Sequence, residues 1–306
     1  MGGMRIAVTG STGLIGSALV RSLLADGHEV VRLVRHRSRV GEQPDGTVGV
    51  GWNPHLLQVD AAGLEGTDAV VHLAGAGVGD RRWTRAYKQE IRDSRVLGTE
   101  TVAGALAKLK RPPRVLVSAS AVGYYGQTGD RVIDETAPAG DDFLAGVCQE
   151  WEAAARPAAD AGIRVVHPRT GLVLSAAGGA AGRMVPLFRL GLGGRLGSGR
   201  QYWSIISRAD EVAALRFLID RPEISGPVNL TGPEPVTNTE LTEALGRALV
   251  RPTVLPVPTL ALQAVLGEMA VEVVGSHRVV PDRLLASGFR FRHPDVDSAV
   301  RSALED

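Results

Sequence analysis

The glycine-spaced segment 10–16, Gly-Ser-Thr-Gly-Leu-Ile-Gly, constrains the fold of this chain more than any other feature. It follows the apolar run Ile6-Ala7-Val8 and opens a helical stretch over Leu14–Asp26. In that context the first glycine allows a tight turn, the second admits a pyrophosphate close to the backbone, and the third lets the helix pack near the strand. Unsatisfied N–H groups at the helix start attract negative charge. The alternative is a glycine-rich turn without a ligand, but the flanking strand and helix favour a dinucleotide site.

The end of the second predicted strand, Glu29–Val34, indicates which dinucleotide binds. A carboxylate there accepts hydrogen bonds from the ribose 2′-OH of NAD, whereas an arginine meets the 2′-phosphate of NADP. This strand is followed by Arg35-His36-Arg37-Ser38-Arg39, which contains no acid. One charge-assisted hydrogen bond contributes about 1.5–3 kcal/mol, roughly a ten- to hundred-fold preference. The sequence therefore predicts NADP(H) with Arg35 on the 2′-phosphate, while Arg37 and Arg39 also fit a solvated basic loop.

Apolar runs alternate with helical stretches through the first half of the chain. Continuous rather than alternating apolar strands indicate a parallel sheet covered on both faces. We therefore expect an α/β fold with a doubly wound Rossmann sheet over residues 1–170. Residues 171–306 mix short helices with glycine- and proline-rich turns and predict a smaller C-terminal substrate lobe, with some segments returning to the sheet. The six predicted strands are Ile6–Thr9, Glu29–Val34, Val48–Trp52, Ala69–Leu73, Arg114–Ser118 and Arg164–Pro168.

Composition narrows the classes of partner. The net charge of +1 gives no overall attraction to nucleic acid or to an anionic membrane. No apolar run is long enough to span a bilayer, and the chain starts almost directly with its first strand, so we expect a cytoplasmic protein. Cys148 is the single cysteine, and the seven histidines lack ligand-like spacing. We therefore expect no intramolecular disulfide and no metal.

In an open sheet of this kind, ligands bind at the carboxyl ends of the strands. After the fourth strand come His72-Leu73-Ala74-Gly75, and His72 is equally well explained as a core histidine. After the fifth come Ser118, Ser120, Tyr124 and Tyr125, and after the sixth comes Arg169. Ser120 and a tyrosine are the candidates for polarising a carbonyl and moving a proton. The alternatives are a hydroxyl that satisfies strand-end backbone groups and aromatic rings packed under the lobe.

Together these residues resemble the extended short-chain dehydrogenase/reductases, and more narrowly their atypical, epimerase-like YfcH branch. The resemblance covers nearly the whole chain. Its most specific segments are Arg81-Arg82-Trp83-Thr84 with Lys88, Ser94 and Arg95; Trp151-Glu152; Phe188 to Gln201; Asn229-Leu230-Thr231; Pro233 to Asn238; Arg251-Pro252-Thr253; Pro256-Val257-Pro258; Gly267-Glu268-Met269; and Gly288 to Phe291.

The resemblance implies cofactor contacts that the spacing alone does not establish. It places Lys88 and Ser94 of a long helix, Arg85–Lys110, near the ribose or phosphates, although both also fit an ordinary exposed helix face. It places Arg169 near the nicotinamide, and it makes a homodimer through the long helix an option. The expected NADP(H) contacts are Gly10, Ser11, Thr12, Gly13, Leu14, Ile15, Gly16, Arg35, His72, Leu73, Ala74, Gly75, Lys88, Ser94 and Arg169.

Two departures from the family pattern bear on activity. The helix after the fifth strand lacks the Tyr-x-x-x-Lys pair, because one register holds Phe143 and Val147 and the other Leu144 and Cys148. In the family the lysine lowers the pKa of the tyrosine and holds the nicotinamide ribose. The branch also usually shows Trp-Ile-His where this chain reads Ile-Ile-Ser over 205–207, so the histidine of that pattern, a candidate substrate contact, is absent.

Two functions therefore remain open. The first is an NADPH-dependent epimerase or reductase for a small carbonyl or sugar-like substrate, with Ser120, Tyr124 and Tyr125 as catalytic candidates. The second is a catalytically silent protein that binds or senses NADPH. The missing pair favours the second, and the elaborate glycine-rich lobe favours the first.

Overall fold

The computed structural model describes residues 3–306, and it confirms the predicted α/β class with a large, mostly parallel sheet. The strands are β1 (Arg5–Thr9), β2 (Glu29–Val34), β3 (Gly41–Glu42), β4 (Val48–Asn53), β5 (Gln58–Val59), β6 (Ala69–His72), β7 (Val115–Ser118), β8 (Ser120–Ala121), β9 (Arg164–Thr170), β10 (Leu172–Leu174), β11 (Tyr202–Trp203), β12 (Ile205–Ser207), β13 (Gly226–Leu230) and β14 (Val236–Thr237). The main path of the sheet runs β13-β9-β7-β6-β1-β2-β4-β3, and along it only β3 pairs antiparallel to its neighbour.

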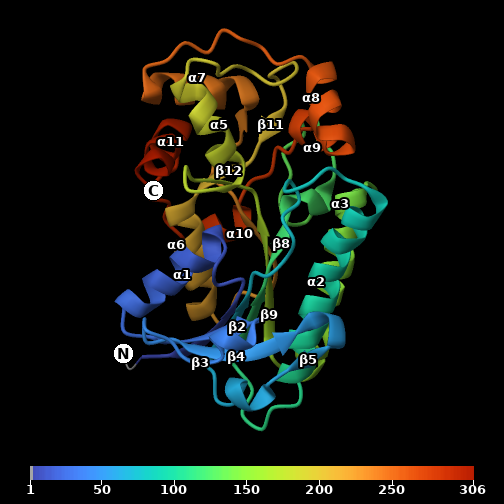
Figure 1. Cartoon of the computed structure of the whole chain (residues 1–306), viewed down its shortest axis with the longest axis vertical. Helices are drawn as coiled ribbons and strands as arrows, with labels where there is room; N and C mark the ends of the chain where they lie inside the picture. Colours follow the sequence, from blue (N-terminus) through green and yellow to red (C-terminus); the bar gives the residue numbers. More distant parts are fainter. Residues whose placement is uncertain (1–2) are drawn as a thin grey trace.

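Helices cover both faces of this sheet, as the continuous apolar strands require. The helices are α1 (Leu14–Ala25), α2 (Arg85–Leu106), α3 (Phe143–Ala153), α4 (Arg156–Asp160), α5 (Gly179–Arg189), α6 (Arg208–Asp220), α7 (Asn238–Leu249), α8 (Thr259–Leu266), α9 (Ala270–Val274), α10 (Asp282–Ala286) and α11 (Val296–Glu305), with 3₁₀ turns η1 (Arg37–Arg39), η2 (Pro54–Leu56), η3 (Ala61–Leu64), η4 (Val122–Tyr125) and η5 (Gly267–Met269). One face packs under α1 and α6, and the other packs under α2 and α4. Figure 1 shows these two helical layers on either side of the strands.

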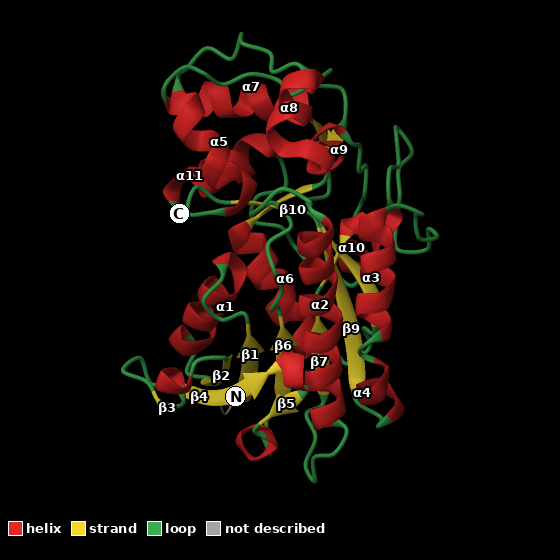
Figure 2. Ribbon diagram, turned by 45° about the vertical axis from the view of Figure 1, so that its right-hand side comes forward, coloured by secondary structure: helices red, strands yellow, loops and turns green. Residues whose placement is uncertain are grey.

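The lobe stands above the carboxyl ends of the parallel strands (Figure 2). Its core is formed by α5, α7 and α11 with the short strand pairs β10–β12 and β11–β14. The chain beyond residue 171 also contributes to the main sheet, because β13 pairs with β9 at its edge and α6 covers one face. No helix within residues 3–306 is both long and apolar enough to cross a membrane.

The predicted strands agree with the structure to within one or two residues. The long helix predicted to end at Lys110 ends at Leu106 instead. Beyond it, the backbone N–H groups of Lys110 and Arg111 donate to the Glu65 carboxylate at 3.3 and 2.6 Å. Those donors therefore do not continue the helical hydrogen-bond series.

Glu211 on α6 gives stability a specific pH dependence. It is fully buried, and its Oε1 accepts a hydrogen bond from Thr170 Oγ1 at 2.9 Å while its Oε2 has no partner. Burial raises its pKa from 4.5 to about 8. Between those pH values the folded chain holds a proton that the unfolded chain has released, so stability falls as pH rises through this range.

Replacing Glu211 by glutamine should remove this dependence. We expect the free energy of unfolding of Glu211→Gln to exceed that of the parent by about 3–5 kcal/mol at pH 9. At pH 5 the two free energies should differ little. Urea unfolding at the two pH values measures the effect. An equal difference at both would mean that Glu211 does not titrate between them.

Candidate nucleotide and substrate site

The glycine segment forms a turn in which two of the three glycines are required by the protein's own backbone, because a side chain there would clash with it. Gly10 has φ +63°, and a Cβ there would lie 2.8 Å from the Leu73 carbonyl carbon. A Cβ on Gly16 would lie 2.2 Å from the Gly10 carbonyl oxygen. A Cβ on Gly13 would meet only that oxygen, at 3.3 Å. The protein itself therefore leaves almost enough room for a side chain at Gly13. The space in front of this glycine is free for a ligand.

The start of α1 is ready to receive an anion. Gly13 is its N-cap residue, and no side chain caps the helix there. Its first turn contains no acidic residue, so the free N–H groups and the positive end of the helix dipole meet no negative charge from the helix's own first turn. Leu14 and Ile15 lie in this first turn and pack against the core beneath α1 and α6 rather than lining the cavity.

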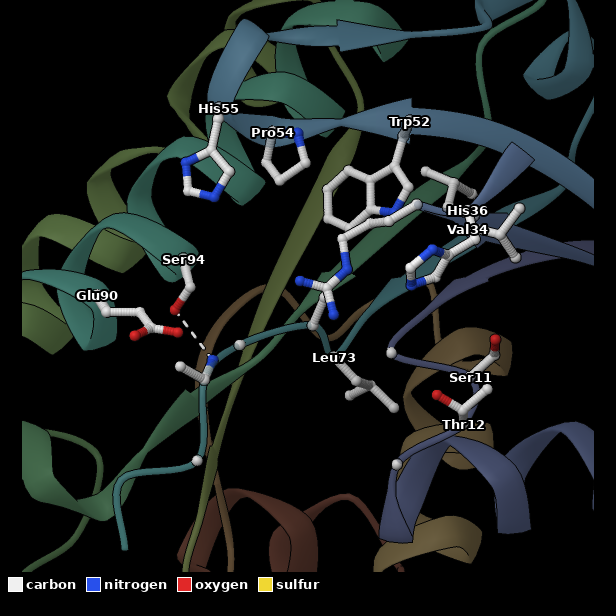
Figure 3. A pocket seen from close by; sticks show the side chains of 18 of the residues that line it. Ser11, Thr12, Val34, His36, Trp52, Pro54, His55, Leu73, Glu90 and Ser94 are labelled. Atoms are coloured by element: carbon white, nitrogen blue, oxygen red, sulfur yellow. Dashed lines mark hydrogen bonds between the residues drawn. The ribbon is translucent and has the colours of Figure 1, made fainter. Parts of the chain in front are cut away.

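A cavity of about 570 Å³ opens in front of this turn, at the carboxyl ends of β1, β2, β4 and β6. Figure 3 shows Ser11 and Thr12 on one side of it and Trp52, Pro54 and His55 on the other. Its lining residues are 10–13, 33–36, Arg39, Trp52, Pro54, His55, 73–77, Asp80, Arg81, Tyr87, Glu90 and Ser94.

The far end of the cavity is cationic and aromatic. Arg35, His36 and Arg39 follow β2, and Arg35 forms no ion pair with any residue in 3–306. Trp52 near the end of β4 and Pro54 just after it supply a flat apolar wall. The sequence analysis placed Trp52 only as the last residue of a predicted strand and assigned it no contact with a ligand. Its position at the carboxyl end of the third predicted strand was the available signal.

His72 lies beneath the cavity rather than in it. The Thr9 hydroxyl accepts hydrogen bonds from the backbone N–H groups of Leu73 and Ala74 at 3.0 and 3.1 Å, so its own hydrogen is directed to His72 Nδ1 at 2.8 Å. Burial lowers the pKa of His72 to about 4, and the ring is therefore neutral. Together Thr9 and His72 hold the strand-end loop, and residues 73–75 of that loop form the cavity wall.

Helix α2 brings Ser94, but not Lys88, to the cavity. Ser94 Oγ accepts a hydrogen bond from Ala76 N at 3.0 Å (Figure 3). Lys88 instead forms an ion pair with Glu268 at 2.5 Å and lies over the Phe143 ring, outside the cavity.

Arg95 is a half-buried cation that sequence reasoning did not assign a role. Its Nη1 donates to the Ala76 and Ile91 carbonyls at 2.9 and 3.0 Å, and its guanidinium lies 4.9 Å from the Trp151 ring centroid. No acidic side chain within residues 3–306 forms an ion pair with it. Its position against Ala76 places an uncompensated positive charge behind the cavity wall.

Ser120 and Tyr125, predicted as catalytic residues, join one buried network with Arg169, which was predicted as a cofactor contact. Ser120 Oγ donates to Glu152 Oε1 at 2.7 Å, and Arg169 binds both Glu152 oxygens at 2.8 and 2.9 Å. Arg169 Nη1 also donates to the Tyr125 hydroxyl at 3.0 Å, which in turn donates to Asn229 Oδ1 at 2.7 Å. Ser120, Tyr125 and Arg169 are each buried.

The hydrogen bonds of this network determine which hydroxyl groups still have a hydrogen or a lone pair free for a substrate. Burial raises the pKa of Tyr125 to about 12, and its hydroxyl hydrogen is engaged by Asn229. Ser120 directs its hydrogen to a carboxylate and therefore presents its lone pairs elsewhere. Tyr124 is only half-buried, and its ring lies 3.4 Å beneath the Arg169 guanidinium. Of the two tyrosines, Tyr124 has the less committed hydroxyl.

The orientation of α3 shows which side chains stand in place of the missing Tyr-x-x-x-Lys pair. Leu144 packs against Gly123, and the Cys148 thiol lies 3.8 Å from the Ala121 carbonyl oxygen, so Leu144 and Cys148 face the Ser120 turn. Val147 points to the cluster around Trp83 and Tyr87. Burial raises the pKa of Cys148 to about 12, so the thiol is a buried, un-ionised group at the position that faces the site.

Glu272, a partly buried carboxylic acid on α9, lies on the lobe side. Asp142 caps α3 by accepting from Ala145 N at 2.9 Å, beside Gly126. Burial, followed by the charge of Asp142, raises the pKa of Glu272 on α9 to about 7. Glu272 is therefore an acid that exchanges its proton near neutral pH.

Comparisons with known proteins agree with this geometry. Residues 6–230 match the NAD dependent epimerase/dehydratase family, and residues 257–303 match a domain of unknown function. The chain is 50% identical over 296 residues to an epimerase family protein of Mycobacterium bovis, covering 96% of each chain.

Two solved structures share the fold. The human epimerase family protein SDR39U1 (isoform 2), solved with NADPH, superposes with a TM-score of 0.90 at 36% identity, covering 99% of this chain and 100% of that one. A nucleoside-diphosphate sugar epimerase from Corynebacterium glutamicum gives a TM-score of 0.79 at 36% identity, covering 99% of this chain and 58% of that one. The predicted resemblance is therefore confirmed, and the chain belongs to the NAD-dependent epimerase/dehydratase family, within its atypical extended short-chain dehydrogenase/reductase branch.

Proposed function

We propose that this protein is an NADPH-dependent reductase or epimerase that acts on a small carbonyl or sugar-like substrate. The observation that carries the proposal is the cavity itself, with an uncapped helix start at one end and the unpaired Arg35 at the other. The room left in front of Gly13 and the flat Trp52 wall fit a pyrophosphate and an adenine. The human relative solved with NADPH supports the choice of cofactor.

Arg35 should determine the preference for the phosphorylated cofactor. We expect Arg35→Glu to weaken NADPH binding by about 30- to 100-fold while changing NADH binding less than about threefold, because only NADPH has a 2′-phosphate to lose its cation. Calorimetric titration measures both. Arg37→Glu is the matched control, since Arg37 is exposed beside the cavity but does not line it. Equal losses for the two nucleotides would reject the role of Arg35.

The second half of the site holds the reacting groups. When bound, the nicotinamide accepts or donates a hydride. Ser120, fixed by Glu152, would accept a hydrogen bond from a substrate hydroxyl, or turn to donate to a carbonyl. Tyr124, whose hydroxyl is the less committed of the two, is the candidate proton donor in place of the absent tyrosine of the family pair. Arg95, supplied from α2, would provide the positive charge that the absent lysine supplies in other members.

The alternative function is a protein that binds NADPH without turnover. Leu144 and Cys148, neither of which titrates near neutral pH, face the Ser120 turn where the family pair would stand, and this observation favours it.

Turnover experiments separate the two functions. NADPH oxidation is followed against a panel of aldehydes, ketones and keto sugars, first with the parent and then with Ser120→Ala. We expect turnover that falls at least about tenfold in Ser120→Ala. Turnover unchanged by the substitution would reject Ser120 as a catalytic residue, and NADPH binding without turnover on any compound would favour the silent protein.

Partners and location belong to the same proposal. The partner is a small-molecule substrate, and α2 remains the candidate surface for a homodimer. A cytoplasmic location fits a protein whose one cysteine, Cys148, is buried and free.

A further inference from the structure

The end of the lobe carries an exposed apolar surface that the proposed function does not use. We define it by Leu187, Leu190, Leu192, Val250, Val254 and Leu260 and refer to it as the apical surface. Leu190, Val250, Val254 and Leu260 are 73, 83, 77 and 78% exposed. The loops that carry it form the end of the molecule farthest from the N-terminus (Figure 1). None of the described cavities is lined by these residues.

The two segments that form this surface are fastened together through their backbones. Arg251 Nε donates to the Arg189 carbonyl at 2.9 Å, and Val257 N donates to the Arg195 carbonyl at 2.9 Å. Gly194 forms a β-bridge with Val254, and a Cβ on Gly194 would lie 1.7 Å from the Leu255 carbonyl oxygen. Because the polar backbone groups satisfy one another in this way, the apolar side chains project outward from a closed framework.

The backbone conformation of Val250 indicates that the exposed apolar side chains of the apical surface do not serve the stability of the fold. It ends α7 with φ 52° and ψ 51°, a left-handed conformation that β-branched residues rarely adopt and that glycine usually occupies. Its side chain is the most exposed of the large apolar ones. A strained and solvated valine contributes little to the isolated fold, and such positions are typical of contact sites.

The charge around the apical surface identifies the kind of partner. Residues 161–209 and 244–267 contain no aspartate or glutamate. Arg189, Arg195 and Arg251 are exposed there, and none forms an ion pair with a residue in 3–306. Two copies meeting face to face would bring these arginines together, which disfavours self-association. The surface is complementary to a negatively charged partner.

We propose that the apical surface binds the headgroup region of an anionic membrane. Leucine and valine side chains that alternate with unpaired arginines on a protruding end match the chemistry of an interfacial anchor, in which apolar groups enter the headgroup boundary and cations meet anionic lipid. This replaces the expectation drawn from net charge. The total of +1 averages over the chain, whereas charges are screened within about 10 Å and so act locally.

Vesicle flotation tests the proposal. Purified protein is mixed with vesicles of phosphatidylcholine alone or with 40% phosphatidylglycerol, in low salt and in 0.5 M NaCl. We expect binding to the anionic vesicles at least tenfold stronger than to the neutral ones, and substantially reduced by salt. No binding to anionic vesicles would overturn the proposal.

Substitutions locate the contact. The double variant Leu190→Asp/Val254→Asp should lose at least tenfold in vesicle binding, and Arg189→Glu/Arg251→Glu should lose a similar amount. The matched control is Leu56→Asp/Val132→Asp, which alters exposed apolar residues elsewhere and should bind as the parent does. Thermal melting checks that each variant folds. Equal binding by the apical and control variants, or a dimer in gel filtration that only the apical variants dissociate without vesicle binding, would overturn the assignment.

Discussion

Gly13→Ala should produce a protein as stable as the parent that no longer binds NADPH. Gly13 has φ −75° and ψ 175°, which alanine adopts freely, and its Cβ would meet only the Gly10 carbonyl oxygen at 3.3 Å. We therefore expect a change in unfolding free energy of about 1 kcal/mol or less. The proposed pyrophosphate, however, needs the space that this methyl group fills. We expect the NADPH affinity to fall by about 100-fold or more, measured by calorimetry beside a thermal melt.

Substitutions of two other glycines provide comparisons for this result. Gly16→Ala places a Cβ 2.2 Å from the Gly10 carbonyl oxygen, so it should lower both stability and binding. Gly104→Ala on α2 meets nothing within 4 Å, so it should leave binding unchanged and raise stability by up to about 1 kcal/mol. If Gly13→Ala binds NADPH as the parent does, the pyrophosphate does not lie against this turn.

Glu152→Gln should destabilise the fold severely, although Glu152 does not line the nucleotide cavity. The side chain of Arg169 is 4% exposed, and both of its bonds to carboxylate oxygen end on Glu152. Removing the charge leaves a buried guanidinium without a counter-charge, and breaking such a pair costs about 3–5 kcal/mol. Urea unfolding measures the loss. Glu150→Gln, which removes a surface pair with Arg92, should change stability by less than about 1 kcal/mol.

A double-mutant cycle separates the pair from its surroundings. Arg169→Met alone leaves Glu152 buried beside Ser120, whereas Glu152→Gln/Arg169→Met removes both charges. We expect the double variant to lose at least about 2 kcal/mol less than the sum of the two single losses. Additive losses would mean that the network does not couple the two residues.

The sequence was sufficient for six parallel strands of the main sheet, but not for β13, which also pairs parallel with β9. The strands β1, β2, β4, β6, β7 and β9 are short, continuous apolar runs that have no solvent-facing side, so their limits were predicted to within two residues. The pieces β10, β11, β12 and β14 are two or three residues long, which is too short for a periodic pattern. Their pairing depends on segments far apart in the chain, as when β11 meets β14.

The parts of the site that are formed by one short stretch of sequence were predictable. The turn 10–16 and Arg35 lie at strand ends, and the structure places both at the cavity, with Gly10 and Gly13 in its wall. The Ser120 network was not predictable, because Glu152 and Arg169 lie 32 and 49 residues farther along the chain and meet Ser120 only through the pairing of β8 with β9 and the packing of α3. For Lys88, a helical position alone did not show that the side chain faces Glu268 rather than the cavity.

Calorimetric titration of the purified protein with NADPH and NADH tests the central claim most directly. We expect one site per chain for NADPH, with NADH at least about tenfold weaker because NADH offers Arg35 no 2′-phosphate to bind. No heat from either nucleotide, or equal affinity for the two, would contradict it.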